Sequence, residues 1–200
     1  MYRIDTITDN ILEEYFNKYA IEVKNYMIQL RDGIITIPGE FGIKNKILIM
    51  YKVKKGTPTW NFLNKYVQDA NLHKLLCGSW EELLEIISDV ESLIPNLEWK
   101  KGATKAEYNK GKYLTDGKDA NGRIYIDHFN EIMHWLFVDI MYETKLDKLQ
   151  FIEKLGLKIC PYCGRQHINI AKFSGYRASK PNIDHFLPKS LYPFLCGEAA

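Results

Sequence analysis

The C-terminal fifth of the chain contains two cysteines with the spacing of a metal knuckle. Cys160 and Cys163 are separated by Pro-Tyr, and Gly164 follows them. This spacing lets a tight turn aim both thiolates at one point, and the glycine lets the backbone amides fold back toward the sulfurs. Two thiolates placed in this way form half of a tetrahedral zinc site. Two alternatives are a pair of buried, unligated cysteines and a redox pair. A redox pair usually opens a helix after a strand, whereas Gly164 and the β-compatible residues beyond it favour a hairpin.

A structural zinc ion needs four ligands, and the sequence does not contain the usual second Cys-x-x-Cys pair downstream. His167 and Cys196 are the candidates within the same segment. One interpretation is therefore a complete site formed by Cys160, Cys163, His167 and Cys196. The interpretation that we favour is that Cys160 and Cys163 are half of a site whose other ligands lie beyond Ala200.

A second group of reactive residues follows, in the segment Ile183-Asp-His-Phe-Leu-Pro-Lys-Ser190. The carboxylate of Asp184 can bind a hard divalent cation such as Mg²⁺ or Mn²⁺. The imidazole of His185 has an ordinary pKa of about 6.5 and can take a proton from water at neutral pH. An Asp-His pair alone is weak evidence, because Asp127-His128 is another one. That pair lies at the start of a helical pattern, and we interpret it as a helix cap and a satisfied helix residue.

Together the two motifs resemble the HNH endonucleases. The segment C-P-Y-C-G-R, followed by D-H-F-L-P-K-S-x-Y-P, is similar to a bacterial group whose zinc knuckle precedes an Asp-His-Phe-x-Pro-Lys-Ser segment. The resemblance covers about residues 158–195. It implies a ββα-metal fold in which His185 is the general base, Asp184 is a ligand of a catalytic Mg²⁺ or Mn²⁺ ion, and Cys160 and Cys163 hold a structural Zn²⁺ ion.

The family pattern continues with an Asn-Leu segment, a second Cys-x-x-Cys pair and a helical Asn or His, which this sequence does not contain. We therefore expect a fragment of a longer protein, with a degenerate domain as the alternative. The full-length protein is expected to be a metal-dependent endonuclease, similar in arrangement to bacterial defence and mobile-element nucleases, and the 200-residue chain is expected to be inactive. The competing function is a non-catalytic zinc-knuckle module that binds nucleic acid or protein.

Charge and composition suggest where such a protein acts. The chain has 27 Lys+Arg and 25 Asp+Glu, so its net charge of +2 excludes a uniformly polybasic binder. The segment 160–200 nevertheless has five basic residues against two acidic ones, and we expect these bases to contact the phosphates of a nucleic acid, in particular DNA. They are Arg165, Lys172, Arg177, Lys180 and Lys189. The polar N-terminus and the absence of a long apolar run predict a cytoplasmic protein without a membrane partner.

The elements that position these residues are predicted from apolar periodicity and capping signals. Residues 1–156 form a mainly α-helical domain of unknown role, which could dock a partner protein, and residues 157–200 form the zinc knuckle and hairpin of the HNH domain. Apolar residues at three- and four-residue steps predict helices over residues 10–33, 58–76, 79–93, 126–144 and 146–155. The apolar runs within 34–55 suit either strands or buried helical turns. The Gly- and Lys-rich stretch 99–122 is predicted to be an exposed loop or linker.

Overall fold

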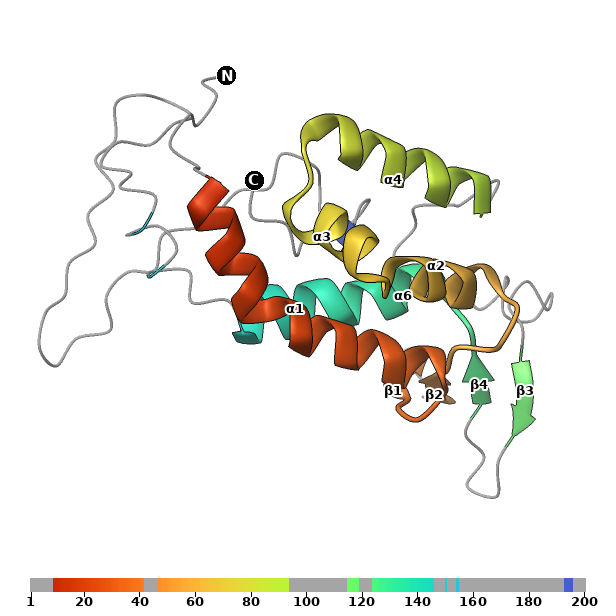
Figure 1. Cartoon of the computed structure of the whole chain (residues 1–200). Coiled ribbons are helices and arrows are strands. Elements are labelled where there is room, and N and C mark those ends of the chain that lie inside the picture. Colours follow the sequence, from red (N-terminus) through yellow and green to blue (C-terminus); the bar gives the residue numbers. More distant parts are fainter. Residues whose placement is uncertain are drawn as a thin grey trace, which may run out of the picture.

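The computed structural model describes residues 9–41, 47–93, 115–118, 124–145, 150, 154 and 193–195 of the chain. Helices make up most of this part, and a small four-stranded sheet stands at one end of them (Figure 1). The expectation of a mainly helical region is therefore confirmed. The ββα-metal fold predicted for 157–200 and the boundary near residue 156 stay predictions, because only 193–195 are described beyond residue 154.

The first helix, α1 (Asp9–Arg31), has one buried face made by residues that recur at steps of three or four, namely Tyr15, Tyr19, Val23, Met27 and Leu30. The helix ends at Arg31, and Gly33, two residues further on, has a φ angle of +67°. A glycine adopts this left-handed conformation without the steric penalty of a side chain, and the amide of Gly33 donates to the carbonyl of Leu30 at 3.0 Å. The predicted helix over 10–33 is confirmed.

Of the two apolar runs within 34–55, the run 47–51 is strand β2 (Ile47–Tyr51), whereas only the last residue of the run 34–37 lies in a strand, β1 (Ile37–Phe41). The two strands pair antiparallel. Strand β2 also pairs in parallel with β4 (Ile124–Ile126), which pairs antiparallel with β3 (Thr115–Lys118). The sheet order is β1-β2-β4-β3. The prediction of a loop over the whole of 99–122 is thus wrong for β3, whose polar sequence Thr-Asp-Gly-Lys has low strand propensity and is paired only through tertiary contact with β4.

The predicted helix over 58–76 is two helices, α2 (Pro58–Tyr66) and α3 (Asp69–Cys77). The chain is extended at Gln68, with ψ at 136°, and this turns α3 away from the axis of α2. The side-chain amide of Asn71 donates to the carbonyl of Lys65 at 2.9 Å, which satisfies one of the carbonyl groups that the break leaves open. Apolar periodicity continues across the break because both helices face the same core. The sequence pattern alone therefore did not reveal the break between α2 and α3.

Helix α4 (Trp80–Leu93) begins with a reciprocal cap. The amide of Glu82 donates to the hydroxyl of Ser79 at 3.3 Å, and the amide of Ser79 donates to Glu82 Oε2 at 2.9 Å. The predicted helix over 79–93 and its Ser79 cap are confirmed.

A polar contact joins α4 to α2. The phenol of Tyr66 donates to Asp89 Oδ2 at 2.6 Å, and Lys65 pairs with the same carboxylate. Burial and this hydrogen bond raise the pKa of Tyr66 well above its ordinary range. Burial alone would raise the pKa of Asp89, but the hydrogen bonds from Lys65 and Tyr66 outweigh it, so the pKa of Asp89 is lowered. Both shifts stabilise the pair as a protonated phenol and an ionised carboxylate.

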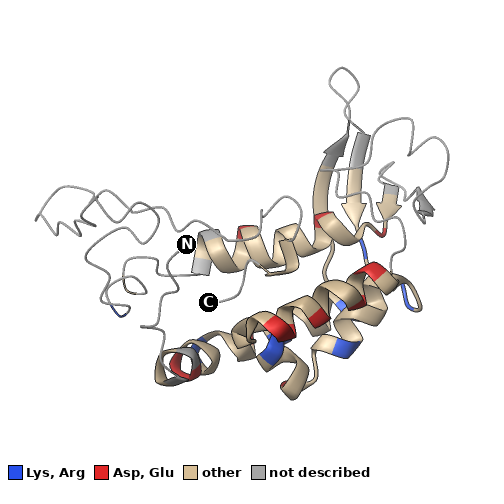
Figure 2. Ribbon diagram, turned by 90° about the horizontal axis from the view of Figure 1, so that it is seen from above, with Lys and Arg blue, Asp and Glu red and all other residues tan. Residues whose placement is uncertain are grey.

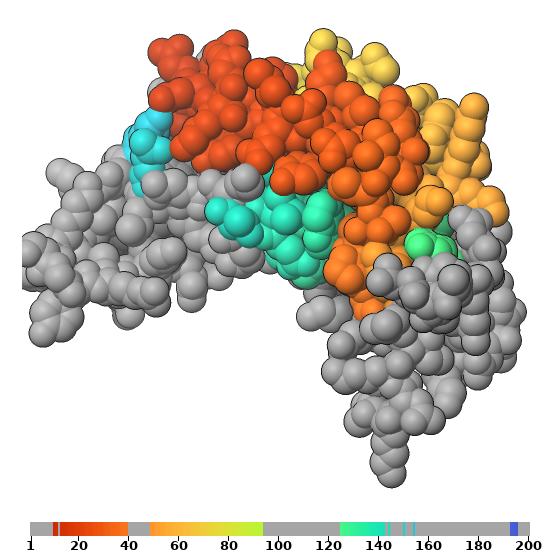
Figure 3. Space-filling model, turned by 90° about the horizontal axis from the view of Figure 1, so that it is seen from below, coloured from red at the N-terminus to blue at the C-terminus, as the bar shows by residue number. Residues whose placement is uncertain are grey.

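The helix predicted over 126–144 begins later than expected. Ile126 is still in strand β4, and helix α6 (Phe129–Met133) continues directly into η1 (His134–Lys145), which has π-helical geometry. This wider helix lies beside α1 (Figure 3), and Trp135 packs edge-to-face on Tyr26 with the ring centres 5.8 Å apart. Of the helix predicted over 146–155, residues 150 and 154 are described, and both are helical.

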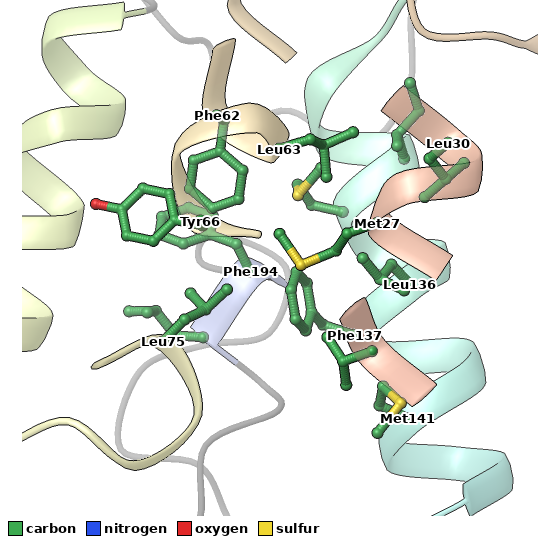
Figure 4. Packing of buried hydrophobic residues seen from close by; sticks show 14 of the residues in the cluster. Met27, Leu30, Phe62, Leu63, Tyr66, Leu75, Leu136, Phe137, Met141 and Phe194 are labelled. Carbon is green, nitrogen blue, oxygen red and sulfur yellow. The ribbon is translucent and has the colours of Figure 1, made fainter. Parts of the chain in front are cut away.

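A single hydrophobic cluster holds these elements together. Figure 4 shows side chains from α1, α2, α3 and η1 meeting around Met27, Phe62, Leu75 and Phe137. The short 3₁₀ turn η2 (Pro193–Leu195) adds Phe194 to the same cluster, although it follows η1 by almost fifty residues. In the part of the chain that the structure describes, no helix is both long and apolar enough to cross a membrane.

Candidate functional site

The residues predicted to act in catalysis, metal binding and nucleic-acid binding lie outside the described residues. They are Asp184, His185, Cys160, Cys163, Arg165, Lys172, Arg177, Lys180 and Lys189, and the two further zinc-ligand candidates, His167 and Cys196, also lie outside. Their predicted roles stay predictions. The structure does describe two related features. One is Phe194, which follows the D-H-F-L-P-K-S segment in the sequence and packs against the helices. The other is the second Asp-His pair, Asp127-His128.

Phe194 marks that contact. It follows His185 by nine positions and is separated from Phe186 by Leu-Pro-Lys-Ser-Leu-Tyr-Pro. Its ring is fully buried, and the ring centre lies 5.9 Å from that of Phe62 on α2 and 5.8 Å from that of Phe129 on α6. The rings of Phe62 and Phe129 are themselves 5.3 Å apart. All three contacts are edge-to-face, which is a favoured geometry for aromatic pairs. Phe194 is thus the third member of an aromatic triad.

The second Asp-His pair has a structural role that the hydrogen bonds of Asp127 show directly. Asp127 Oδ2 accepts from the backbone amide of Lys54 at 3.0 Å and lies 2.6 Å from the hydroxyl of Thr57. That hydroxyl also accepts from the amide of Trp60 at 3.3 Å and so caps α2. Asp127 therefore connects the chain entering α6 to the chain entering α2.

His128 is the N-cap residue of α6. Its Nδ1 atom accepts from the backbone amide of Glu131 at 3.3 Å, and its ring is 6% exposed and packs on Tyr51 of β2 with the centres 6.1 Å apart. A buried imidazole whose Nδ1 accepts a backbone hydrogen bond is positioned for helix capping. The interpretation of Asp127-His128 as a cap and a satisfied helix residue is therefore confirmed in part: the pair stands at a helix start, but the cap is His128, Asp127 precedes it, and neither residue is inside α6.

Buried polar side chains gather at the starts of these two helices. The buried polar residues among those described are Thr57, Thr59, His128 and Asn130. Among the residues that the structure describes, the side-chain amide of Asn130 has no hydrogen-bond partner at either its nitrogen or its oxygen, although the residue is 6% exposed. Buried amides are normally hydrogen-bonded, so this amide is an exception within the described core. Sequence reasoning missed Thr57 and Asn130; the Thr-Pro start of α2 was the available signal for Thr57.

Other residues that bind metals in proteins do not converge within the described residues, where no group of three or more His, Cys, Asp and Glu side chains could hold an ion. His134 Nδ1 lies 3.4 Å from Asp139 Oδ1 across one turn of η1, and both side chains are partly exposed. Cys77 is buried and is not in a disulfide. These contacts indicate packing and surface pairing.

Most of the chain is close to neutral. Residues 1–159 contain 22 Lys+Arg and 23 Asp+Glu, a net charge of −1, and residues 160–200 contain five and two, a net charge of +3. Acidic and basic residues are interspersed along the helices (Figure 2), and several bases are paired with acids, for example Lys24 with Asp69 and Lys74 with Glu85.

Comparison of the chain with protein-family models, with curated proteins and with solved structures gave no match.

Proposed function

We propose that this chain belongs to an HNH-type endonuclease that hydrolyses phosphodiester bonds of nucleic acid, in particular DNA, with the help of a divalent cation. The single observation that supports this proposal is the sequence pair formed by C-P-Y-C-G and D-H-F-L-P-K-S, with twenty residues between Cys163 and Asp184. Each motif alone occurs in unrelated proteins. Their combination supplies a zinc knuckle, which stabilises a small domain, together with the metal ligand and the general base that metal-assisted hydrolysis needs.

The donor types fit the two proposed ions. The thiolates of Cys160 and Cys163 are soft ligands of the kind that structural zinc takes, and the Asp184 carboxylate is a hard oxygen ligand of the kind that Mg²⁺ and Mn²⁺ take. A bound divalent cation would stabilise the negative charge that develops on the phosphate and the leaving oxygen. His185 takes the proton from the attacking water, and an imidazole is suited to this step because it titrates near neutral pH.

The charge distribution along the sequence supports this proposal. Residues 160–200 have a net charge of +3, and residues 1–159 have a net charge of −1. Phosphate binding is therefore assigned to the bases of this C-terminal segment, Arg165, Lys172, Arg177, Lys180 and Lys189. The helical part is left to support the nuclease segment and to dock a partner protein. The Cys-x-x-Cys pair, and a buried Cys77 that is not in a disulfide, suit a reducing compartment, so we place the protein in the cytoplasm of the cell.

The test is a cleavage assay with the full-length gene product, using supercoiled DNA and a single-stranded RNA as parallel substrates in Mg²⁺. We expect Asp184→Ala and His185→Ala to abolish cleavage while the dissociation constant for nucleic acid stays within about threefold of wild type. Partial rescue by Mn²⁺ is expected for Asp184→Ala alone, because an added cation can restore metal occupancy but cannot accept a proton. Tight nucleic-acid binding without cleavage in any metal would identify the protein as a non-catalytic zinc-knuckle module instead.

A further inference from the structure

Helix α4 has an apolar strip on its outer face. The helix lies beside α2 and α3 (Figure 1), and the side chains of Leu83, Ile86 and Val90 are buried on its inner face. Trp80 and Leu84 lie one turn apart outside this buried face, and 44% and 46% of their surfaces are exposed. Tryptophan is one of the residue types most enriched at the energetic centres of protein interfaces.

The charge of α4 has a single sign, because the helix contains five acidic residues and no basic one. Three of these acids form ion pairs with Lys65 of α2 or Lys74 of α3, inside the helical part. The other two, Glu81 and Glu91, form no ion pair with the residues that the structure describes, and both are exposed. Their charges are therefore open to a partner.

The two open acids border the apolar strip. Glu81 follows Trp80 directly, and Glu91 lies seven residues, or about two turns, after Leu84. Glu91 is also in the last turn of α4, where the helix dipole favours a base and disfavours an acid. Neither this acid nor the exposed tryptophan improves the stability of the helix, and such departures from local rules are expected where a surface has a function.

We propose that the α4 surface, formed by Trp80, Glu81, Leu84 and Glu91, docks a basic amphipathic segment of a partner protein. Apolar side chains of that segment cover Trp80 and Leu84, and its Lys or Arg side chains pair with the two acids. The negative charge disfavours the other occupants, because a nucleic acid, an anionic membrane and a second copy of the α4 surface would all be repelled. This inference goes beyond the nuclease chemistry and does not depend on it.

The test measures the binding of a labelled model peptide to the full-length gene product by fluorescence anisotropy. The probe is an amphipathic helix of Leu and Lys with about five turns. We expect the dissociation constant to rise about tenfold for Leu84→Ser and for the double variant Glu81→Lys/Glu91→Lys. The matched controls are Ile21→Ser and Glu13→Lys, which change an exposed apolar residue and an exposed acid of α1, and both should bind within about twofold of wild type.

The place of binding is measured separately by fluorine NMR of protein labelled with 5-fluorotryptophan, with Trp80→Phe to assign the signal. Saturation with the peptide should shift the signal of Trp80 and leave that of Trp135, in η1, in place. No binding, an unmoved Trp80 signal, equal weakening in the α1 controls, or equal affinity for a Lys–Ser peptide of the same charge would overturn the α4 surface. Docking at Trp80 by a protein that cleaves no nucleic acid would support this inference while the proposed nuclease fails.

Discussion

Replacement of Asp127 by alanine should destabilise the protein strongly without removing a catalytic group. The carboxylate of Asp127 accepts from the amide of Lys54 at 3.0 Å and lies 2.6 Å from the hydroxyl of Thr57. A hydrogen bond to a charged group contributes about 1.5–3 kcal/mol. Because Asp127 is partly exposed, we take the lower end for each bond, which gives about 3 kcal/mol in total. For a chain of this length that loss corresponds to a decrease in Tm of roughly 6–12 °C.

The assay is urea unfolding followed by tryptophan fluorescence at pH 7. Asp127→Asn keeps an acceptor oxygen without the charge and should lose about half as much stability as Asp127→Ala. Asp139→Ala is the control, since Asp139 pairs with His134 at the surface and such pairs contribute about 0–1 kcal/mol. A free energy of unfolding for Asp127→Ala within 0.5 kcal/mol of wild type, on the order of measurement error, would refute the assignment of this Asp-His pair to structure.

Three further substitutions test single contacts. Ser79→Ala should lower the free energy of unfolding by about 1 kcal/mol because α4 loses its cap, and urea unfolding that shows no change would contradict the capping contact. The raised pKa of Tyr66 means that its contribution to stability is complete below about pH 10 and decreases above it, as the phenol ionises in the unfolded chain. The urea concentration at the midpoint of unfolding should therefore fall less steeply between pH 9 and 11 for Tyr66→Phe than for the wild-type protein. Equal slopes for the two proteins would count against a raised pKa of Tyr66. Asn130→Leu should leave stability unchanged or raise it by up to about 2 kcal/mol, since the buried amide has no partner among the described residues; a loss above about 1 kcal/mol in urea would show that it has one.

Sequence patterns predicted the helices well where local signals and tertiary packing agree. The Ser79 cap with Glu82, and the glycine after α1, are encoded within three or four residues, so they could be read directly. The break between α2 and α3 could not, because both helices direct their apolar residues to one core and the pattern continues through Gln68. The π geometry of η1 was also not predicted, since a wide helix has no distinct sequence signal.

Long-range pairing accounts for the remaining differences. Strand β3 has a turn-like sequence and becomes a strand only because β4 pairs with it, and Ile126 joins β4 where a helical pattern had been expected. A helix cap at Asp127-His128 was predicted from its place at a helix start, but the capping residue is His128, and the contacts of Asp127 with Lys54 and Thr57 were not predicted. The contact of Phe194 with Phe62 and Phe129 joins residues more than sixty positions apart, and no local pattern indicates such a pair. The zinc and nuclease residues were proposed from motifs alone.

The most direct test of the proposed nuclease compares the two Asp-His pairs in one experiment. Single-turnover cleavage of DNA in Mg²⁺ is measured for the wild-type gene product, for His185→Ala and for His128→Ala, at a temperature where all three are folded. A general base contributes about 10²–10⁴-fold to a rate, so we predict a decrease of that size for His185→Ala. His128→Ala should cleave at nearly the wild-type rate and lose only stability, because His128 caps α6. Loss of cleavage in His128→Ala with full activity in His185→Ala would contradict the assignment of catalysis to the D-H-F-L-P-K-S segment.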